Sequence, residues 1–182
     1  MRLIIVLPLL GGLALAGCNR GAEVEAENAS AAEVAQKVRA SGAELKLRPG
    51  RWETRVQLDE VTAPGLPAGA IDQMRSAIAS ATPASCLTPA EANKPAADFF
   101  AGKDAGKQCR YETFTMGNGR ISAVLRCAEG SGGVRLAMNG SYGPDEFRIT
   151  QELDTGAGGQ TMHMKMRVAA RRTGECQGNE AA

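Results

Sequence analysis

The last two fifths of the chain alternate apolar and polar residues, and this alternation constrains the fold more than any other feature of the sequence. It begins at Gln108 and is interrupted by the turn sequences Gly117-Asn118-Gly119, Pro144-Asp145 and Gly156-Ala157-Gly158-Gly159. A period of two places successive side chains on opposite faces of a strand, and Asn-Gly is a strong hairpin signal. The sequence therefore predicts a meander of antiparallel strands with one apolar and one charged face.

The turns also predict which residues pair between neighbouring strands. A three-residue loop over 117–119 pairs Met116 with Arg120, Thr113 with Ala123, Tyr111 with Leu125 and Cys109 with Cys127. A turn at Pro144-Asp145 pairs Tyr142 with Phe147, Gly140 with Ile149 and Leu136 with Leu153. The apolar face then continues through Met162, Met164, Met166 and Val168, and the charged face carries Arg135, Arg148, Glu152, Lys165, Arg167 and Arg171.

An earlier strand and two short helices complete the predicted fold. Trp52, Thr54, Val56 and Leu58 alternate with polar residues up to the turn Ala63-Pro64-Gly65, and Trp52 is expected to be a buried anchor of this strand. Residues 68–81 have helical apolar spacing, and Thr88-Pro89-Ala90-Glu91 is a capping box, with Lys94-Pro95 ending the helix soon after. We expect a β-rich α+β domain: a curved antiparallel meander sheet with one or two short helices on its apolar face.

The first eighteen residues indicate export. Arg2 precedes an apolar run that is shorter than the ~20 residues of a membrane span, so residues 1–17 are expected to be a signal peptide. Leu15-Ala16-Gly17-Cys18 resembles the lipobox of bacterial lipoproteins, which implies a diacylglycerol on Cys18 and cleavage after Gly17. An ordinary secretory signal with a chance cysteine is the alternative. The resemblance predicts a lipid-anchored protein of the cell envelope that faces the periplasm, and Asn19 favours the outer membrane over the inner.

Four further cysteines suit that compartment. Cys86, Cys109, Cys127 and Cys176 form an even set in an exported chain, so two disulfides are expected, in one of three pairings. The predicted register favours Cys109–Cys127, which leaves Cys86–Cys176; a slip of one residue would undo this choice.

The domain boundaries follow from composition. Residues 18–45 are rich in Ala, Glu and Gly, and are expected to be the lipidated N-terminus and a flexible tether. A short helix from the capping box Ser30-Ala31-Ala32-Glu33 to Ser41-Gly42 is the alternative, although Val34 and Val38 alone make a thin apolar stripe. A single domain is predicted over 46–177, and a disordered tail over 178–182.

Charge and motifs exclude several function classes. The formal net charge is +1 and no basic block occurs, so nucleic acid is not an expected partner. The chain lacks CxxC and GxSxG motifs. Met162, Met164 and Met166 would suit copper(I), but alternation places His163 on the other face, and the methionines are expected to pack the sheet. Glu152 and Asp154 share a strand face, as solvated acidic pairs often do. We therefore expect no cofactor, no metal and no catalytic residue.

A set of ordered motifs resembles one family. Arg48-Pro49-Gly50-Arg51-Trp52-Glu53, Cys86-Leu87-Thr88, Cys109, Cys127 and Arg171-Arg172-Thr173-Gly174-Glu175-Cys176 are similar to those of the proteobacterial domain-of-unknown-function 3617 family. The resemblance implies a small exported or lipid-anchored envelope protein, with no agreed activity and no catalytic residue to transfer.

The expected function is therefore a non-catalytic binding or structural module of the cell envelope. An envelope protein is one expected partner. An apolar ligand in a cavity on the Met- and Leu-lined sheet face is another, unless the helices cover that face. An enzyme whose site cannot be recognised in the sequence is the remaining alternative.

Overall fold

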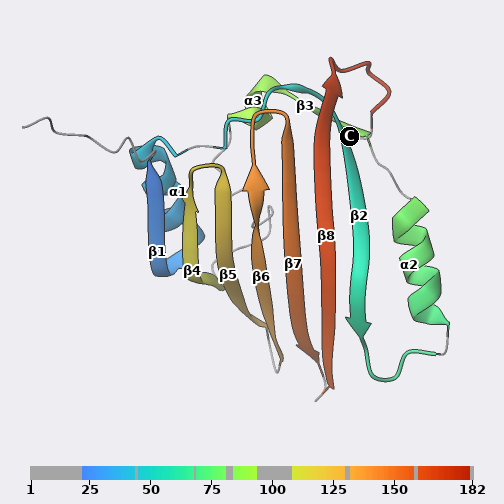
Figure 1. Ribbon diagram of the computed structural model, residues 1–182. Coiled ribbons are helices and arrows are strands. Elements are labelled where there is room, and N and C mark those ends of the chain that lie inside the picture. The colour runs from blue at the N-terminus through green and yellow to red at the C-terminus, as the bar shows by residue number, and fades with distance from the viewer. Residues whose placement is uncertain are drawn as a thin grey trace, which may run out of the picture.

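The computed structural model describes residues 22–43, 45–67, 69–80, 84–93, 108–129, 132–157 and 160–180. Its elements are β1 (Glu23–Ser30), α1 (Ala31–Ser41), β2 (Gly50–Thr62), α2 (Ala70–Ser80), β3 (Ala84–Leu87), α3 (Pro89–Ala92), β4 (Cys109–Gly117), β5 (Arg120–Glu129), β6 (Gly132–Tyr142), β7 (Glu146–Ala157) and β8 (Gln160–Gly174). In this part of the chain the strands form one antiparallel sheet in the order β1-β4-β5-β6-β7-β8-β2-β3 (Figure 1). The predicted β-rich meander is confirmed. None of the described helices is long and apolar enough to cross a membrane.

The β4–β5 hairpin has the predicted register in one half only. Cys109 pairs with Cys127 and Tyr111 with Leu125 as expected. The pairs Met116–Arg120 and Thr113–Ala123 are wrong, because Gly117 itself pairs with Arg120. Asn118 and Gly119 form a two-residue turn with φ angles of 51° and 72°, the left-handed backbone that such a turn requires. An irregularity between Tyr111 and Thr113 then restores the predicted register at the cysteines.

The next two hairpins follow the prediction. Tyr142 pairs with Phe147, Gly140 with Ile149 and Leu136 with Leu153. At the end of β7, Gly156 and Ala157 are still paired with β8, so the two strands extend into the segment that was expected to form a four-residue turn. Residues 158–159 lie outside the described part of the chain.

Strand β2 joins the start of the predicted domain to its end. Its residues Trp52 to Leu58 pair with Arg172 to Met166 of β8, and β3 pairs with the first four residues of β2 on the other side. Trp52 is buried, donates its indole N–H to the carbonyl oxygen of Arg48 at 3.0 Å, and stacks on Phe147 with ring centroids 6.1 Å apart. The expected buried anchor is confirmed.

Both favoured disulfides are present. Cys109 and Cys127 are direct cross-strand neighbours with Cα atoms 4.0 Å apart, close to the spacing of a non-hydrogen-bonded pair. Cys86 lies on β3, next to Arg51 of β2, while Gly174 flanks Arg51 on the other side. The Cys86–Cys176 bond therefore passes from one neighbour of β2 to the other, with Cα atoms 5.4 Å apart.

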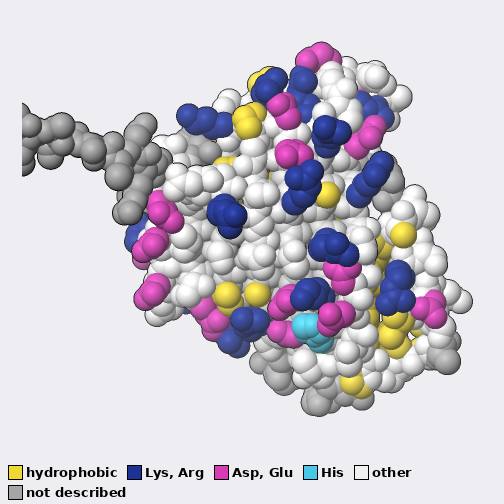
Figure 2. Space-filling model, viewed as in Figure 1, with side chains coloured by type: hydrophobic (Ala, Val, Ile, Leu, Met, Phe, Trp, Pro, Cys, Tyr) yellow, Lys and Arg dark blue, Asp and Glu magenta, His cyan; other side chains and the backbone are white. Residues whose placement is uncertain are grey.

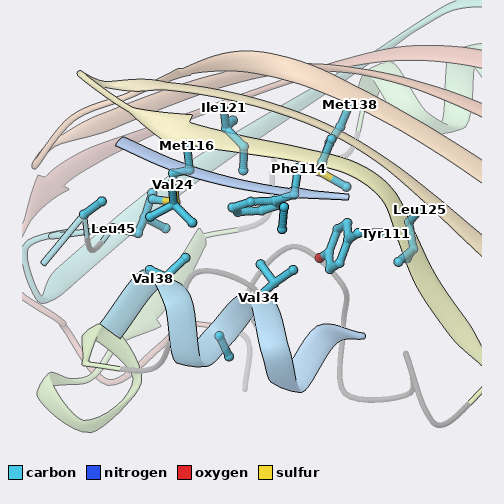
Figure 3. Close-up of a cluster of buried hydrophobic side chains, with 14 of the residues drawn as sticks. Val24, Val34, Val38, Leu45, Tyr111, Phe114, Met116, Ile121, Leu125 and Met138 are labelled. Atoms are coloured by element: carbon cyan, nitrogen blue, oxygen red, sulfur yellow. The ribbon is translucent and has the colours of Figure 1, made fainter. Parts of the chain in front are cut away.

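The expected tether is wrong over Glu23–Ala43. Val24 and Ala26 of β1 pair with β4 and face the core, while the three glutamates between and around them face solvent. Helix α1 has both halves of the capping box at Ser30 and Glu33, and Gly42 ends it in a left-handed conformation. Val34 and Val38 are 0% exposed and pack under Tyr111, Phe114 and Met116 (Figure 3). Two valines suffice because β1 and β4 supply a ready apolar surface for them.

The other helices play smaller parts. Helix α2 matches the predicted segment, but it lies beside β2 at the margin of the sheet, and none of its own residues is buried (Figure 1). The helix on the apolar face is thus α1, not the one expected over 68–81. Helix α3 begins with the predicted capping box at Thr88 and Glu91, and the expected stop at residues 94–95 lies outside the described residues.

The expected disordered tail is wrong as far as Glu180. The Glu180 carboxylate, 2% exposed, accepts hydrogen bonds from the N–H groups of Gln177 and Gly178 and pairs with Arg51 at 3.4 Å. The Gln177 N–H is the main cause of a pKa for Glu180 below its ordinary value.

The two disulfides should differ in their contribution to stability. Cys86→Ala/Cys176→Ala opens a loop of 90 residues and should lower the free energy of unfolding by about 4–5 kcal/mol, against about 3 kcal/mol for Cys109→Ala/Cys127→Ala, which opens a loop of 18. Urea denaturation of the full chain measures both values. A larger loss for the Cys109–Cys127 pair would contradict the entropic ranking.

The packing of α1 can be tested with one charge on either side of the helix. Val38→Asp places a carboxylate in the core and should cost about 3 kcal/mol or more, whereas Gln36→Asp, on the exposed side, should change stability little. Thermal denaturation followed by circular dichroism compares the two. Equally small effects would show that residues 31–41 act as a tether after all.

Candidate functional site

The methionines and the histidine lie on opposite faces of the sheet, as alternation predicts. Met162, Met164 and Met166 pair with Thr155, Leu153 and Gln151 on the apolar side, all partly buried. His163 points to the polar side, where its Nδ1 lies 2.7 Å from Oδ1 of Asp154. Among the described residues no group of three or more His, Cys, Asp or Glu side chains could hold a metal ion.

The acidic residues singled out in the sequence belong to cross-strand ion pairs. Asp154 lies between His163 and Arg135, whose Nη1 is 3.5 Å from the Asp154 carboxylate. Glu152 pairs with Lys165 at 2.9 Å. This pairing lowers the pKa of Glu152 and raises that of Lys165, chiefly through the hydrogen bond between them. Neighbouring opposite charges on the same sheet face explain these contacts in structural terms.

Three of the family-like motifs, those that contain Trp52, Cys86 and Cys176, meet at one end of β2 and β8. The Nε of Arg172 donates a hydrogen bond to the carbonyl oxygen of Pro49 at 2.7 Å. The disulfide between Cys86 and Cys176 lies at the same end of these strands. Gly50 has a φ of 136°, and a Cβ there would lie 2.3 Å from the carbonyl oxygen of Gly174. Only glycine fits such an approach. The motifs therefore hold the first and last strands of the domain together.

The structure places a hollow on the polar face of the sheet, which we call the polar trough. It has a volume of about 1340 Å³ and extends from Glu23 on β1 to Arg75 and Ala79 on α2. Figure 2 looks onto this face, where basic side chains stand around a centre made largely of backbone and of side chains that are neither apolar nor charged. The cavity considered from the sequence was instead on the Met- and Leu-lined face, and the three methionines do not line this hollow.

Two rows of side chains cross the trough at right angles to the strands. The register aligns Arg120, Ser141, Arg148, Ala169 and Arg55 in the first row, and Thr115, Ser122, Asn139, Thr150, Arg167 and Gln57 in the second. The arginines of the first row stand on every second strand, so their Cα atoms are spaced by roughly 9–10 Å, two strand separations. The small residues Ser141 and Ala169 separate them.

The charges of the polar face are distributed unevenly. Outside the trough, in what we call the lower part of this face, charged side chains are paired across strands: Glu152–Lys165, Arg135–Asp154–His163 and Glu112–Arg126. In the trough, Arg148 pairs with Glu146 of its own strand and Arg167 with Asp59, which has a lowered pKa because of the Arg167 hydrogen bond. Arg55 and Arg120 have no ion-pair partner among the residues that the structure describes.

This trough cannot be recognised in the sequence. Alternation places Arg148 and Arg167 on the charged face of the sheet, which is expected to face water. Arg55, Arg120 and Arg148 align only when the register of β2, β5 and β7 is known, because they are separated by long stretches of chain. The number of arginines and their spacing in the sequence do not reveal this alignment.

The chain thus has the architecture of a small single-sheet domain, with its strands fixed by two disulfides and its motifs used to join the ends. A family model for a protein of unknown function (DUF3617) matches residues 47–176, and the chain belongs to this family. The match covers the predicted domain and begins after β1 and α1. Comparisons with curated proteins and with solved structures find no match.

The ion pair on the polar face predicts a pH dependence. Because the folded-state pKa of Glu152 lies below the ordinary 4.5, the pair with Lys165 stabilises the fold above that pH, and the stabilisation is lost as the pH falls through the lowered value. Lys165→Gln should raise the pKa of Glu152 towards its ordinary value, as measured by NMR titration of its side-chain carboxyl. The exposed Lys46→Gln serves as the control and should leave that pKa unchanged.

Proposed function

We propose that this protein is a lipid-anchored, non-catalytic binding module of the bacterial cell envelope, which faces the periplasm from the outer membrane. The anchor would be a diacylglycerol on Cys18, supported by the sequence Leu15-Ala16-Gly17-Cys18. The two disulfides fit an oxidising compartment.

The observation that carries the proposal is the position of β1 relative to Cys18. Strand β1 begins at Glu23, five residues after Cys18, instead of following a long tether. Five residues reach at most about 18 Å, so an acylated Cys18 would hold the domain at the membrane surface. A domain held there is suited to bind a component of the envelope.

The polar trough is the contact surface that the geometry favours over the Met- and Leu-lined face. It is a hollow of about 1340 Å³ on the polar face. The methionines are partly buried, and none of them lines the hollow. An apolar ligand over the methionines remains the second candidate, since Met162, Met164 and Met166 are not fully buried.

The anchor is tested by Cys18→Ser. If Cys18 carries the lipid, this variant should move from the membrane fraction to the soluble fraction of cells that express the full chain, as two acyl chains give stable anchoring and none remain. Cys86→Ser/Cys176→Ser is the matched control, because it removes cysteines but leaves the anchor. Unchanged membrane retention of Cys18→Ser would overturn the proposal.

A further inference from the structure

We infer that the polar trough binds an anionic oligosaccharide, a chain of sugars that carries carboxylate or phosphate groups. This inference deepens the proposed function, on which it rests, by naming the ligand class of the binding module.

The charges of the trough favour an anionic ligand. Arg120, Arg148 and Arg55 line it, and the lining includes one acidic residue, Glu23, at the β1 end. Arginines on neighbouring parts of one sheet face repel each other, and in the lower part of the same face such repulsion is relieved by cross-strand carboxylates. Arg55 and Arg120 have no such carboxylate among the described residues, so the anion they are suited to meet is external.

The second row favours a ligand that also carries hydroxyl groups. Thr115, Ser122, Asn139, Thr150 and Gln57 offer hydroxyls and amides that both donate and accept hydrogen bonds. Sugar hydroxyls have the same double character, whereas a plain polyanion only accepts. The first row would thus contact the acidic groups of an oligosaccharide that lies across the strands, and the second row would contact its ring hydroxyls.

The shape of the trough fits an extended chain. It reaches from β1 to α2, across the width of the sheet, and its arginines recur at a spacing of roughly 9–10 Å along that direction. A ligand with regularly repeated acidic groups can contact several of them at once. Multiple weak contacts of this kind add up in a repeating ligand.

Single-stranded nucleic acid fits the trough less well. Its bases need aromatic side chains to stack on, and the described aromatic residues Trp52, Tyr111, Phe114, Tyr142 and Phe147 all fall on the opposite face by register. The formal net charge of the chain is only +1.

The test measures binding to the full-length protein, extracted in a neutral detergent, by isothermal titration calorimetry. The probes are an oligogalacturonate, which carries carboxylates, and a phosphorylated mannan fragment of similar length. A neutral malto-oligosaccharide and a poly-glutamate with the same number of carboxylates are the comparison ligands. We expect one or both anionic oligosaccharides to bind, more weakly as salt is raised, and the neutral one not to bind.

Arg55→Gln/Arg120→Gln should weaken this binding by about tenfold or more, as expected for the loss of charge-assisted hydrogen bonds. Arg126→Gln/Arg135→Gln is the matched control: it removes the same charge from the same face, outside the trough, and should change the affinity little. Asn139→Ala should weaken binding of the oligosaccharide but not of poly-glutamate. Unchanged melting temperatures verify that each variant is folded.

Several results would overturn the inference. Equal losses in both double variants would show that only net charge matters, and tighter binding of poly-glutamate, unaffected by Asn139→Ala, would indicate an acidic protein as the partner. No binding of either anionic oligosaccharide, with Cys18→Ser still released from the membrane, would refute the ligand class but leave the anchored module standing. If binding requires Arg55 and Arg120 but membrane retention does not require Cys18, the ligand class would stand and the lipid anchor would be refuted.

Discussion

The pairing of β2 with β8 is the constraint on which the rest of the structure depends. Strand β8 pairs with β7 along one side and with β2 along the other. The β2–β8 ladder therefore attaches the first strand of the family domain to the meander that ends in its last strand. The Cys86–Cys176 bond, the Trp52 indole and the Arg172–Pro49 hydrogen bond all lie at one end of the ladder. Loop-closure entropy opposes contacts between such distant segments, and the disulfide reduces that cost by restricting the unfolded chain.

The sheet that results has two faces with different tasks. On the apolar face α1 packs over β1 and β4, and most of the buried residues of this face form one core cluster (Figure 3). The other face carries the charges, and its two ends differ: cross-strand pairs neutralise the lower part, while the polar trough retains arginines without carboxylate partners among the described residues. Arg148 and Arg167 of the trough have carboxylate partners, but Arg55 and Arg120 have none among the described residues, and this makes the trough a candidate for an external anion.

Strand β1 and helix α1 lie outside the segment that the family model matches, yet they belong to the same folded unit. Strand β1 pairs with β4 at one edge of the meander, and α1 packs against both strands, over Tyr111, Phe114 and Met116. The glutamates on β1 also discourage edge-to-edge association, since charged residues on an edge strand oppose pairing with another chain. The short link between β1 and Cys18 makes this edge the part of the domain closest in sequence to the proposed anchor.

The sequence by itself determined part of the local structure: alternation predicted β2 and the β4–β8 meander, the capping box at Thr88 predicted the start of α3, and the Pro144-Asp145 turn predicted its hairpin register. Strands β1 and β3 were not predicted, and the capping box at Ser30 marked a helix only as the alternative to a tether. The pairing of Cys109 with Cys127 was also predicted correctly. The pairs from Thr113 to the turn were not, because the Asn118-Gly119 turn shifts them by one residue and the irregularity at Glu112 then restores the register. The burial of Val34 and Val38 was decided by tertiary structure alone, because two valines become a core stripe only when β1 and β4 supply a surface. The polar trough was likewise invisible, since Arg55, Arg120 and Arg148 become neighbours only when strands distant in sequence are aligned in one sheet.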